Sequence, residues 1–111
     1  MELPLRIKYV GLPRSTNLGD MIHAQSAPLA KLGAQVEDFE VSVEAWTLHH
    51  RQGRQFRVAI ELSLVGVPIT LSRTSRLDPE RSELGALIRE AFDDLLRRVD
   101  AAPKAVGSAP A

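Results

Sequence analysis

Apolar and polar residues alternate along four stretches of the chain, and this period of two predicts half-buried β-strands. The alternating stretches are residues 3–10, 36–46, 55–65 and 67–71. Pro68 lies in the last of them and donates no ladder hydrogen bond, so we place that strand at an edge of the sheet. The expected inward-facing residues are Leu3, Leu5, Ile7, Tyr9, Phe39, Val41, Val43, Ala45, Phe56, Val58, Ile60, Leu62, Leu64, Val67, Ile69 and Leu71.

A helical period follows the first strand. The apolar stripe consists of Leu18, Ile22, Leu29 and Leu32, with Gln25 on the same side. Ser15 or Thr16 can cap the helix, because a hydroxyl accepts a hydrogen bond from a free N–H of the first turn. Pro28 removes one helical hydrogen bond, so we expect a kink or break within residues 24–28. Gly33 is a natural helix end.

A second helical period ends the ordered part of the chain. The segment Asp78-Pro79-Glu80 is typical of a helix start, with an Asp cap, a proline at the first position and an acid in the first turn. The stripe that follows is broad and runs through residue 99. It consists of Leu84, Leu87, Ile88, Ala91, Phe92, Leu95 and Val99.

The element order is therefore β-α-β-β-β-α. We predict an α+β fold in which two helices pack on one face of a four-stranded sheet and the other face is solvated. The length of 111 residues suits one domain. We place that domain at residues 1–100, and we expect residues 101–111, which are rich in Ala and Pro, to form a disordered tail.

Charge is distributed unevenly, although the formal net charge is zero. Residues 1–44 hold four basic and six acidic side chains, and residues 78–100 hold four basic and seven acidic side chains. Residues 45–77 instead hold five arginines and one glutamate, with two histidines among them. This basic segment is a candidate nucleic-acid surface, and a solvated surface is the simpler alternative.

The sequence lacks several features, and their absence argues against some classes of function. The chain has no cysteine, which excludes a disulfide scaffold, a thiol nucleophile and a Cys-based zinc site. It has no nucleophile elbow, phosphate loop or HExxH motif, so we expect neither an enzyme nor a cofactor. It also shows no membrane-length apolar run and no signal-peptide layout, so we expect a cytoplasmic protein.

Six short motifs in a fixed order carry a resemblance to a known family. They are Leu5-Arg6-Ile7-Lys8-Tyr9, Pro13-Arg14-Ser15, Leu48-His49-His50-Arg51-Gln52-Gly53-Arg54, Phe56-Arg57-Val58-Ala59-Ile60-Glu61-Leu62, Pro68-Ile69-Thr70-Leu71-Ser72-Arg73 and Ala86-Leu87-Ile88-Arg89-Glu90-Ala91-Phe92-Asp93-Asp94. The chain resembles the ribosome hibernation promoting factor family, also called sigma modulation or ribosome-associated inhibitor proteins. The similarity covers about residues 3–100 and is greatest to a bacterial subgroup with a histidine-rich hairpin.

The resemblance implies a non-enzymatic function. Family members bind the small ribosomal subunit near the decoding channel, where they occlude tRNA and mRNA and hold ribosomes inactive during stress. Lys31 falls at a lysine position late in the family's first helix, and Arg97 and Arg98 fall near basic positions late in its second. The resemblance therefore implies that these three residues contact rRNA.

The chain also departs from the family pattern. The first helix of the family is usually rich in Lys and Arg, whereas Asp20 to Gly33 contains only Lys31. Gly85 and Arg89 stand where a Tyr and an Asp are common. An Ala/Pro-rich end replaces the typical basic tail. Any RNA-binding surface should therefore be local, and we centre it on residues 51–76.

The predicted RNA-binding residues gather around the hairpin between the second and third strands. Arg51 and Arg54 flank Gly53 in the turn, and Arg57 follows on the strand. Guanidinium groups pair with phosphate oxygens in a bidentate geometry and stay charged at any working pH. The full predicted set is Lys8, Lys31, His49, His50, Arg51, Arg54, Arg57, Arg73, Arg76, Arg97 and Arg98.

Ion pairing within the protein is the competing explanation for some of these cations. Asp93 and Asp94 lie four residues before Arg97 and Arg98, which is the favourable acid-first order on a helix. Arg57 shares the outward face with Glu40, Glu44 and Glu61, so cross-strand pairing is expected there.

The adjacent histidines allow more than one interpretation. In an extended strand His49 and His50 point to opposite faces, which disfavours a shared metal ion, and His23 is the only other imidazole. We therefore predict no metal site. Plain polar turn residues are the simplest interpretation, and base stacking or pH sensing are alternatives.

Trp46 provides the basis for a second functional hypothesis. It is the only tryptophan and falls on the outward parity of its strand. An exposed indole can stack on a base or pack at a protein interface. The alternative function is thus a module of the same fold that self-associates through its sheet edge or Trp46, as a homodimer for example, without binding ribosomes.

Overall fold

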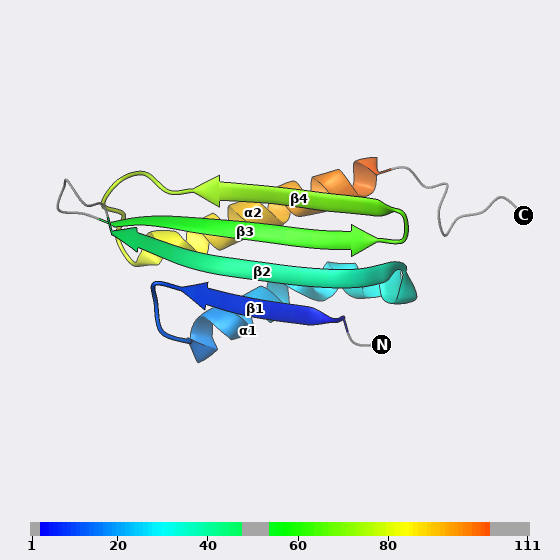
Figure 1. Cartoon of the computed structure of the whole chain (residues 1–111), viewed down its shortest axis with the longest axis horizontal. Coiled ribbons are helices and arrows are strands. Elements are labelled where there is room, and N and C mark those ends of the chain that lie inside the picture. The colour runs from blue at the N-terminus through cyan, green and yellow to red at the C-terminus, as the bar shows by residue number, and fades with distance from the viewer. Residues whose placement is uncertain (1–2, 48–53, 103–111) are drawn as a thin grey trace, which may run out of the picture.

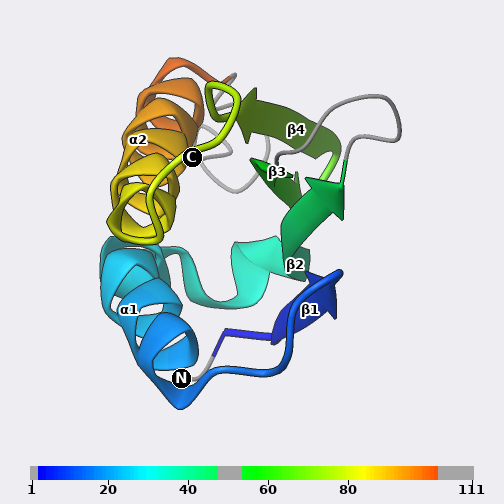
Figure 2. The ribbon, with the colours of Figure 1, turned by 90° about the vertical axis from the view of Figure 1, so that its left-hand side faces the viewer.

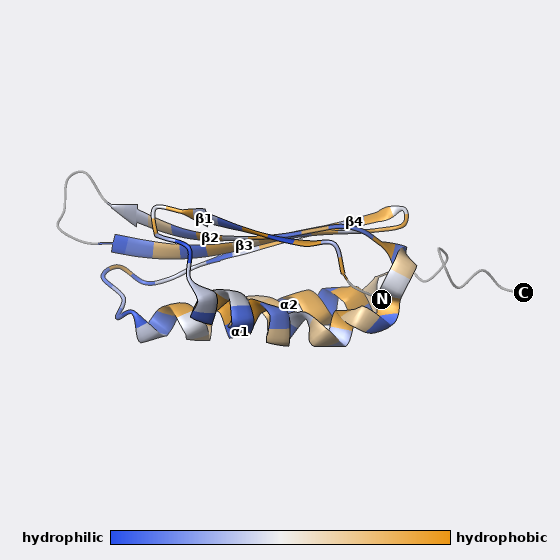
Figure 3. Ribbon diagram, turned by 90° about the horizontal axis from the view of Figure 1, so that it is seen from below, coloured by the Kyte–Doolittle hydropathy of each residue, from blue (hydrophilic) through white to orange (hydrophobic). Residues whose placement is uncertain are grey.

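The computed structural model describes residues 3–47 and 54–102, which form a sheet covered on one face by helices (Figures 1 and 3). The strands are β1 (Leu5–Val10), β2 (Val36–Thr47), β3 (Arg54–Leu64) and β4 (Val67–Thr74). The helices are α1 (Thr16–Ser26), the 3₁₀ segment η1 (Ala27–Gln35) and α2 (Ser82–Ala101). The predicted α+β fold and its β-α-β-β-β-α order are therefore confirmed.

The four strands lie side by side in the order β1-β2-β3-β4. β1 runs parallel to β2, and the other two pairs are antiparallel hairpins. A parallel pair needs a crossover connection, which α1 and η1 provide. The strand that contains Pro68 is an edge strand, as the missing N–H predicts.

The core lies between the sheet and the helices. Figure 2 shows the two layers end-on, with α1 and α2 in one and the strands in the other. Phe39 of β2 and Phe92 of α2 are fully buried and meet edge to face, with ring centroids 6.4 Å apart. The predicted stripe of α2 faces this core, and its first six members are buried.

The first helix breaks where Pro28 requires it. α1 ends at Ser26, and Pro28 lies in the first turn of η1, where no intrahelical N–H is needed. The hydroxyl of Ser26 instead donates to the Ile22 carbonyl oxygen at 2.7 Å. Gly33 has a positive φ of 51° at the end of this helical segment. The N-cap is Ser15, whose Oγ accepts the Leu18 N–H at 3.2 Å.

The predicted start of the second helix is wrong by three residues, because the N-cap is Arg81 and not Asp78, and α2 begins at Ser82. Asp78 has a left-handed φ of 51° and forms a turn. Its Oδ1 accepts the Arg54 N–H at 3.2 Å, and its own N–H donates to the Arg54 carbonyl at 2.9 Å. The Glu83 carboxylate stabilises the start of the helix instead, because it accepts the Glu80 N–H at 2.7 Å. Asp78 therefore ties the incoming loop to β3.

The outer face of the sheet is less solvated than the alternation predicts. Ser42 and Glu44 are only 8% and 9% exposed. The Glu44 carboxylate accepts hydrogen bonds from Ser42 Oγ and Trp46 Nε1, both at 3.0 Å. Arg57, its cross-strand neighbour, approaches it to 3.7 Å. The expected cross-strand pairing is thus present, and Glu44 is buried because its partners cover it.

We expect Phe92→Ala to lower the free energy of unfolding by roughly 3–5 kcal/mol, because it leaves a cavity between the layers. Chemical denaturation of both proteins measures the difference. Leu77→Ala serves as the control, since Leu77 is exposed and its loss should cost no more than about 0.5 kcal/mol. Equal effects of the two substitutions would contradict the assigned core.

Candidate nucleic-acid interface

Both helices begin at the same end of the molecule, where β2 stops and β3 starts (Figure 1). We call this the hairpin end and define it by residues 11–15, Thr47, Arg54 and residues 75–81. A helix N-terminus carries a partial positive charge. Two such termini therefore add partial positive charge to the charge of the arginines at this end.

A cleft of about 470 Å³ opens at the hairpin end between α1, α2 and β3. Its apolar lining consists of Leu12, Pro13, Leu18, Met21, Phe56, Pro79, Leu84 and Gly85. Its polar lining consists of Ser15, Asn17, Ser82 and three arginines, namely Arg54, Arg81 and Arg89. No acidic residue of the described ranges lines it. We call it the arginine cleft.

Each arginine of the cleft comes from a different local structure. Arg54 opens β3, and its backbone is held on both sides by Asp78. Its guanidinium carbon lies 5.7 Å from the centroid of the Phe56 ring, a cation–π distance. Arg81 is the N-cap of α2, and Arg89 is exposed two turns further on. Within residues 3–47 and 54–102, none of the three arginines forms an ion pair.

An ion pair fixes the loop that precedes Arg81. Arg76 Nε and Nη2 donate to the two carboxylate oxygens of Glu83 at 3.0 and 2.7 Å. Glu83 also accepts the Glu80 N–H, so its carboxylate joins two residues of the loop, Arg76 and Glu80, to the first turn of α2. The hydrogen bond from Arg76, followed by that from the Glu80 backbone, lowers the pKa of Glu83. The charge of Glu83 is therefore already engaged beside the cleft.

A second basic group lies along β1 next to the hairpin end. Lys8 and Arg14 line a hollow of about 430 Å³ and, in the part of the chain that the structure describes, have no carboxylate partner. The loop that carries Arg14 is fixed by Tyr9, whose hydroxyl donates to the Ser15 carbonyl at 3.0 Å. Gly11 is required there, since a Cβ would lie 2.1 Å from a carbonyl oxygen of β2.

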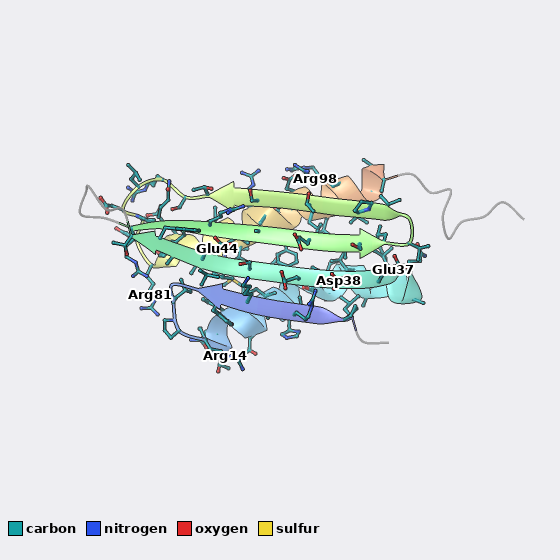
Figure 4. The ribbon with its side chains drawn as sticks, viewed as in Figure 1. Arg14, Glu37, Asp38, Glu44, Arg81 and Arg98 are labelled. Atoms are coloured by element: carbon teal, nitrogen blue, oxygen red, sulfur yellow. The ribbon has the colours of Figure 1, made fainter. Side chains whose placement is uncertain are left out.

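Charges of both signs lie toward the other end of the molecule. Figure 4 shows Arg14 and Arg81 at the hairpin end, whereas Glu37 and Asp38 lie toward the opposite end. Asp100 also lies there, near the end of α2. These carboxylates have cations near them, because Arg6 pairs with Asp38 at 2.6 Å and Arg97 and Arg98 stand just before Asp100 at the end of α2.

The structure brings part of the predicted RNA-binding set to the hairpin end. His49, His50 and Arg51 lie outside the described residues. Arg54 lines the arginine cleft. Arg57 is paired with a carboxylate of the sheet's outer face, as described above. Their contact with RNA stays a prediction.

The remaining predicted residues are spread over the molecule. Arg73 faces α2 and lies 3.6 Å from Glu90. Arg97 and Arg98 approach Asp94 to 3.8 and 3.1 Å, so the predicted helix pairing is present for Arg98. Lys31 is exposed in η1, near the opposite end. For these cations too, RNA contact stays a prediction.

Sequence reasoning missed Arg14, Arg81 and Arg89 as candidate site residues. Arg81 and Arg89 belong to residues 78–100, which are acidic when charges are counted along the chain. None of the acids of that segment lines the cleft, and four of the seven, namely Glu90, Asp93, Asp94 and Asp100, follow Arg89 along α2. Arg14 lies in the motif Pro13-Arg14-Ser15, next to the N-cap residue of α1, and this position could have identified it as a candidate.

No cluster of three or more His, Asp or Glu side chains in the described ranges could hold a metal ion. None of the helices described here is long and apolar enough to cross a membrane.

Comparison with known proteins identifies the fold class. No protein-family model and no curated protein sequence match the chain. The solved structure of the Thermus thermophilus Protein Y N-terminal domain matches with a TM-score of 0.62 and 17% identity, over 91% of this chain and 98% of that one. A ribosomal subunit interface protein from Coxiella burnetii matches with a TM-score of 0.56 and 11% identity, over 86% and 97%. The chain thus has the fold that the family resemblance implied.

We predict that Arg76→Gln raises the pKa of Glu83 toward its ordinary value of 4.5. In the native protein the ion pair stabilises the folded state at pH values above 4.5. This stabilisation is lost as the pH falls through the lowered pKa of Glu83. Carboxyl NMR titration measures the pKa directly. Arg98→Gln is the matched control, which should raise the lowered pKa of Asp94 and leave Glu83 unchanged. An unchanged Glu83 pKa in Arg76→Gln would contradict the assigned ion pair.

Proposed function

We propose that the protein is a ribosome-associated RNA-binding factor whose hairpin end contacts rRNA of the small subunit. Bound near the decoding region, it would occlude mRNA and tRNA and keep the ribosome inactive under stress. The observation that carries this proposal is the gathering of Arg14, Arg54, Arg81 and Arg89 at one end without carboxylate partners among the described residues. The fold shared with a protein titled a ribosomal subunit interface protein supports it.

Arginine is the residue type that this role requires. Its planar guanidinium matches two phosphate oxygens at once, and it keeps its charge in every compartment. Folded RNA is recognised largely by shape and by its phosphates and 2′-hydroxyls, because its deep major groove excludes side chains. Occlusion needs no reacting group, so stable placement of a rigid domain is sufficient.

The distribution of charge supports a defined orientation. A polyanion attracts the arginines of the hairpin end, whereas toward the other end Arg6 and Arg98 already face Asp38 and Asp94. The protein would therefore approach RNA with its helix N-termini first. Because the net charge is zero, binding should depend on these few contacts and weaken steeply with salt.

We expect Arg14→Gln/Arg54→Gln/Arg81→Gln to bind small ribosomal subunits much more weakly than the native protein. Each lost phosphate contact should also reduce the slope of log affinity against log salt by about 0.7–0.9. Co-sedimentation at several salt concentrations measures both quantities. The fold should persist, because the three side chains are exposed.

Arg97→Gln/Arg98→Gln is the matched control for that experiment. It also removes arginine charge, but at the opposite end and from an acidic neighbourhood. It should change ribosome binding much less than the hairpin-end variant. A native protein that is folded yet fails to co-sediment at any salt would sink the proposal.

Self-association through Trp46 is the second candidate function. The indole is 50% exposed, and its Nε1 bond to the buried carboxylate of Glu44 holds it in place. A fixed, exposed aromatic ring is suited to a protein interface. It lies on the outer face of the sheet, away from the helices that line the arginine cleft.

For this second function we expect a concentration-dependent dimer that Trp46→Ala converts to monomer in sedimentation velocity. Glu44→Gln is an informative companion, since it keeps the ring but removes the charge that orients it. A native protein that remains monomeric at high micromolar concentration would rule out this function.

A further inference from the structure

We propose that the arginine cleft binds a free nucleoside polyphosphate, with the base against its apolar floor and the phosphates against its arginines. This inference goes beyond the proposed function, because the ligand is a small molecule and its binding requires no ribosome. The volume of about 470 Å³ lies within the range of small-molecule sites. A nucleic-acid duplex could touch the rim, whereas a ligand of nucleotide size is small enough to enter.

The floor of the cleft offers apolar surface from several elements. Leu18 and Met21 come from α1, Phe56 from β3 and Leu84 from α2. Small-molecule sites are lined mostly by apolar and aromatic side chains, with a few polar groups for orientation. A planar base can bury its faces against such a floor.

Gly85 helps to keep this floor free of side chains. A Cβ at Gly85 would lie 3.2 Å from the terminal methyl of Met21 and 3.8 Å from Arg89 Nη1. The methyl group of Met21 thus reaches the backbone of α2 directly, and no side chain projects from Gly85 into the cleft. Arg89 follows one turn later on the same helix and is exposed.

The arginines are spaced for more than one phosphate. Arg81 and Arg89 are eight residues apart on α2, about 12 Å along the helix axis. Arg54 approaches from the start of β3. The described lining residues include three arginines and no carboxylate. This excess of positive charge favours a ligand with two or three phosphates over a ligand with a single negative charge.

The remaining polar groups suit the rest of such a ligand. Ser15, Asn17 and Ser82 supply hydroxyl and amide groups for a ribose or a base edge. The N-cap residue Arg81 makes no side-chain hydrogen bond to its helix. The Glu83 and Leu84 N–H groups of the first turn donate to the carbonyl oxygens of Glu80 and Arg81, so the phosphates would be held by the arginine side chains of the cleft.

We would titrate the protein with ATP, GTP and ADP and follow the methyl resonances of its two methionines, Met1 and Met21. Met21 lines the cleft, so its resonance should shift in a saturable manner. Adenosine alone and inorganic tripolyphosphate test the base and the phosphates separately. We expect each of these two probes to bind at least ten-fold more weakly than the best nucleotide.

Ser82→Glu is the decisive variant. An acid in the first turn of α2 favours the helix, so the melting temperature should be unchanged or higher. The same charge repels phosphate in the cleft, and nucleotide affinity should fall at least ten-fold. Arg89→Gln should also weaken binding, whereas Arg97→Gln on the same helix should leave it unchanged.

Three results would overturn the inference. The first is no saturable shift of Met21 with any nucleotide at millimolar concentration. The second is unchanged affinity in Ser82→Glu, and the third is tripolyphosphate binding as tightly as the nucleotides. Binding of RNA without binding of any mononucleotide would also reject it while leaving the proposed function intact, because the titration contains no ribosomes.

Discussion

The parallel pairing of β1 with β2 determines where the other parts of this molecule lie. Because β2 must run in the same direction as β1, the chain has to return along the sheet between them, and α1 and η1 are that return. α1 therefore begins where β1 ends. β4 also ends there, so α2 starts at the same place. The parallel pairing and the two antiparallel pairs thus gather two helix N-termini with the end of β2 and the start of β3.

This arrangement explains how a neutral chain can present a basic surface. Arg14 precedes α1, Arg54 opens β3 and Arg81 opens α2, so residues far apart in sequence meet at the hairpin end. The turn at Asp78 and the Arg76–Glu83 pair hold the connecting loop against the sheet and the helix. The cations elsewhere in the described chain mostly have carboxylate neighbours.

The sequence predicts most of the fold because its strongest signals are local. Alternation locates the strands, the stripe around Phe92 identifies α2, and Pro28 marks the break after α1. Asp78 was misassigned because an aspartate favours both helix caps and turns, and only its contact with Arg54 decides between them. The burial of Glu44 likewise depends on partners from another strand, which alternation does not describe.

The candidate site was harder to predict, for a physical reason. Counting charge along the chain assigns Arg81 and Arg89 to an acidic segment, although the fold turns both toward the cleft and leaves the neighbouring acids outside its lining. The same counting gives weight to Arg73, and the family resemblance gives weight to Arg97, but the fold places both beside carboxylates. Spatial neighbours, and not sequence neighbours, determine which arginines remain available to a phosphate.

The most direct measurement uses the absence of cysteine, which allows single cysteines to carry a probe without background labelling. Ser82→Cys places an iron chelate at the hairpin end, and Val65→Cys places one in the β3–β4 turn at the opposite end. Hydroxyl radicals from each site would cleave the rRNA near it on the small subunit. We expect strong, localised cleavage from position 82 and little from position 65. The reverse pattern, or cleavage from neither site, would contradict an RNA interface at the hairpin end.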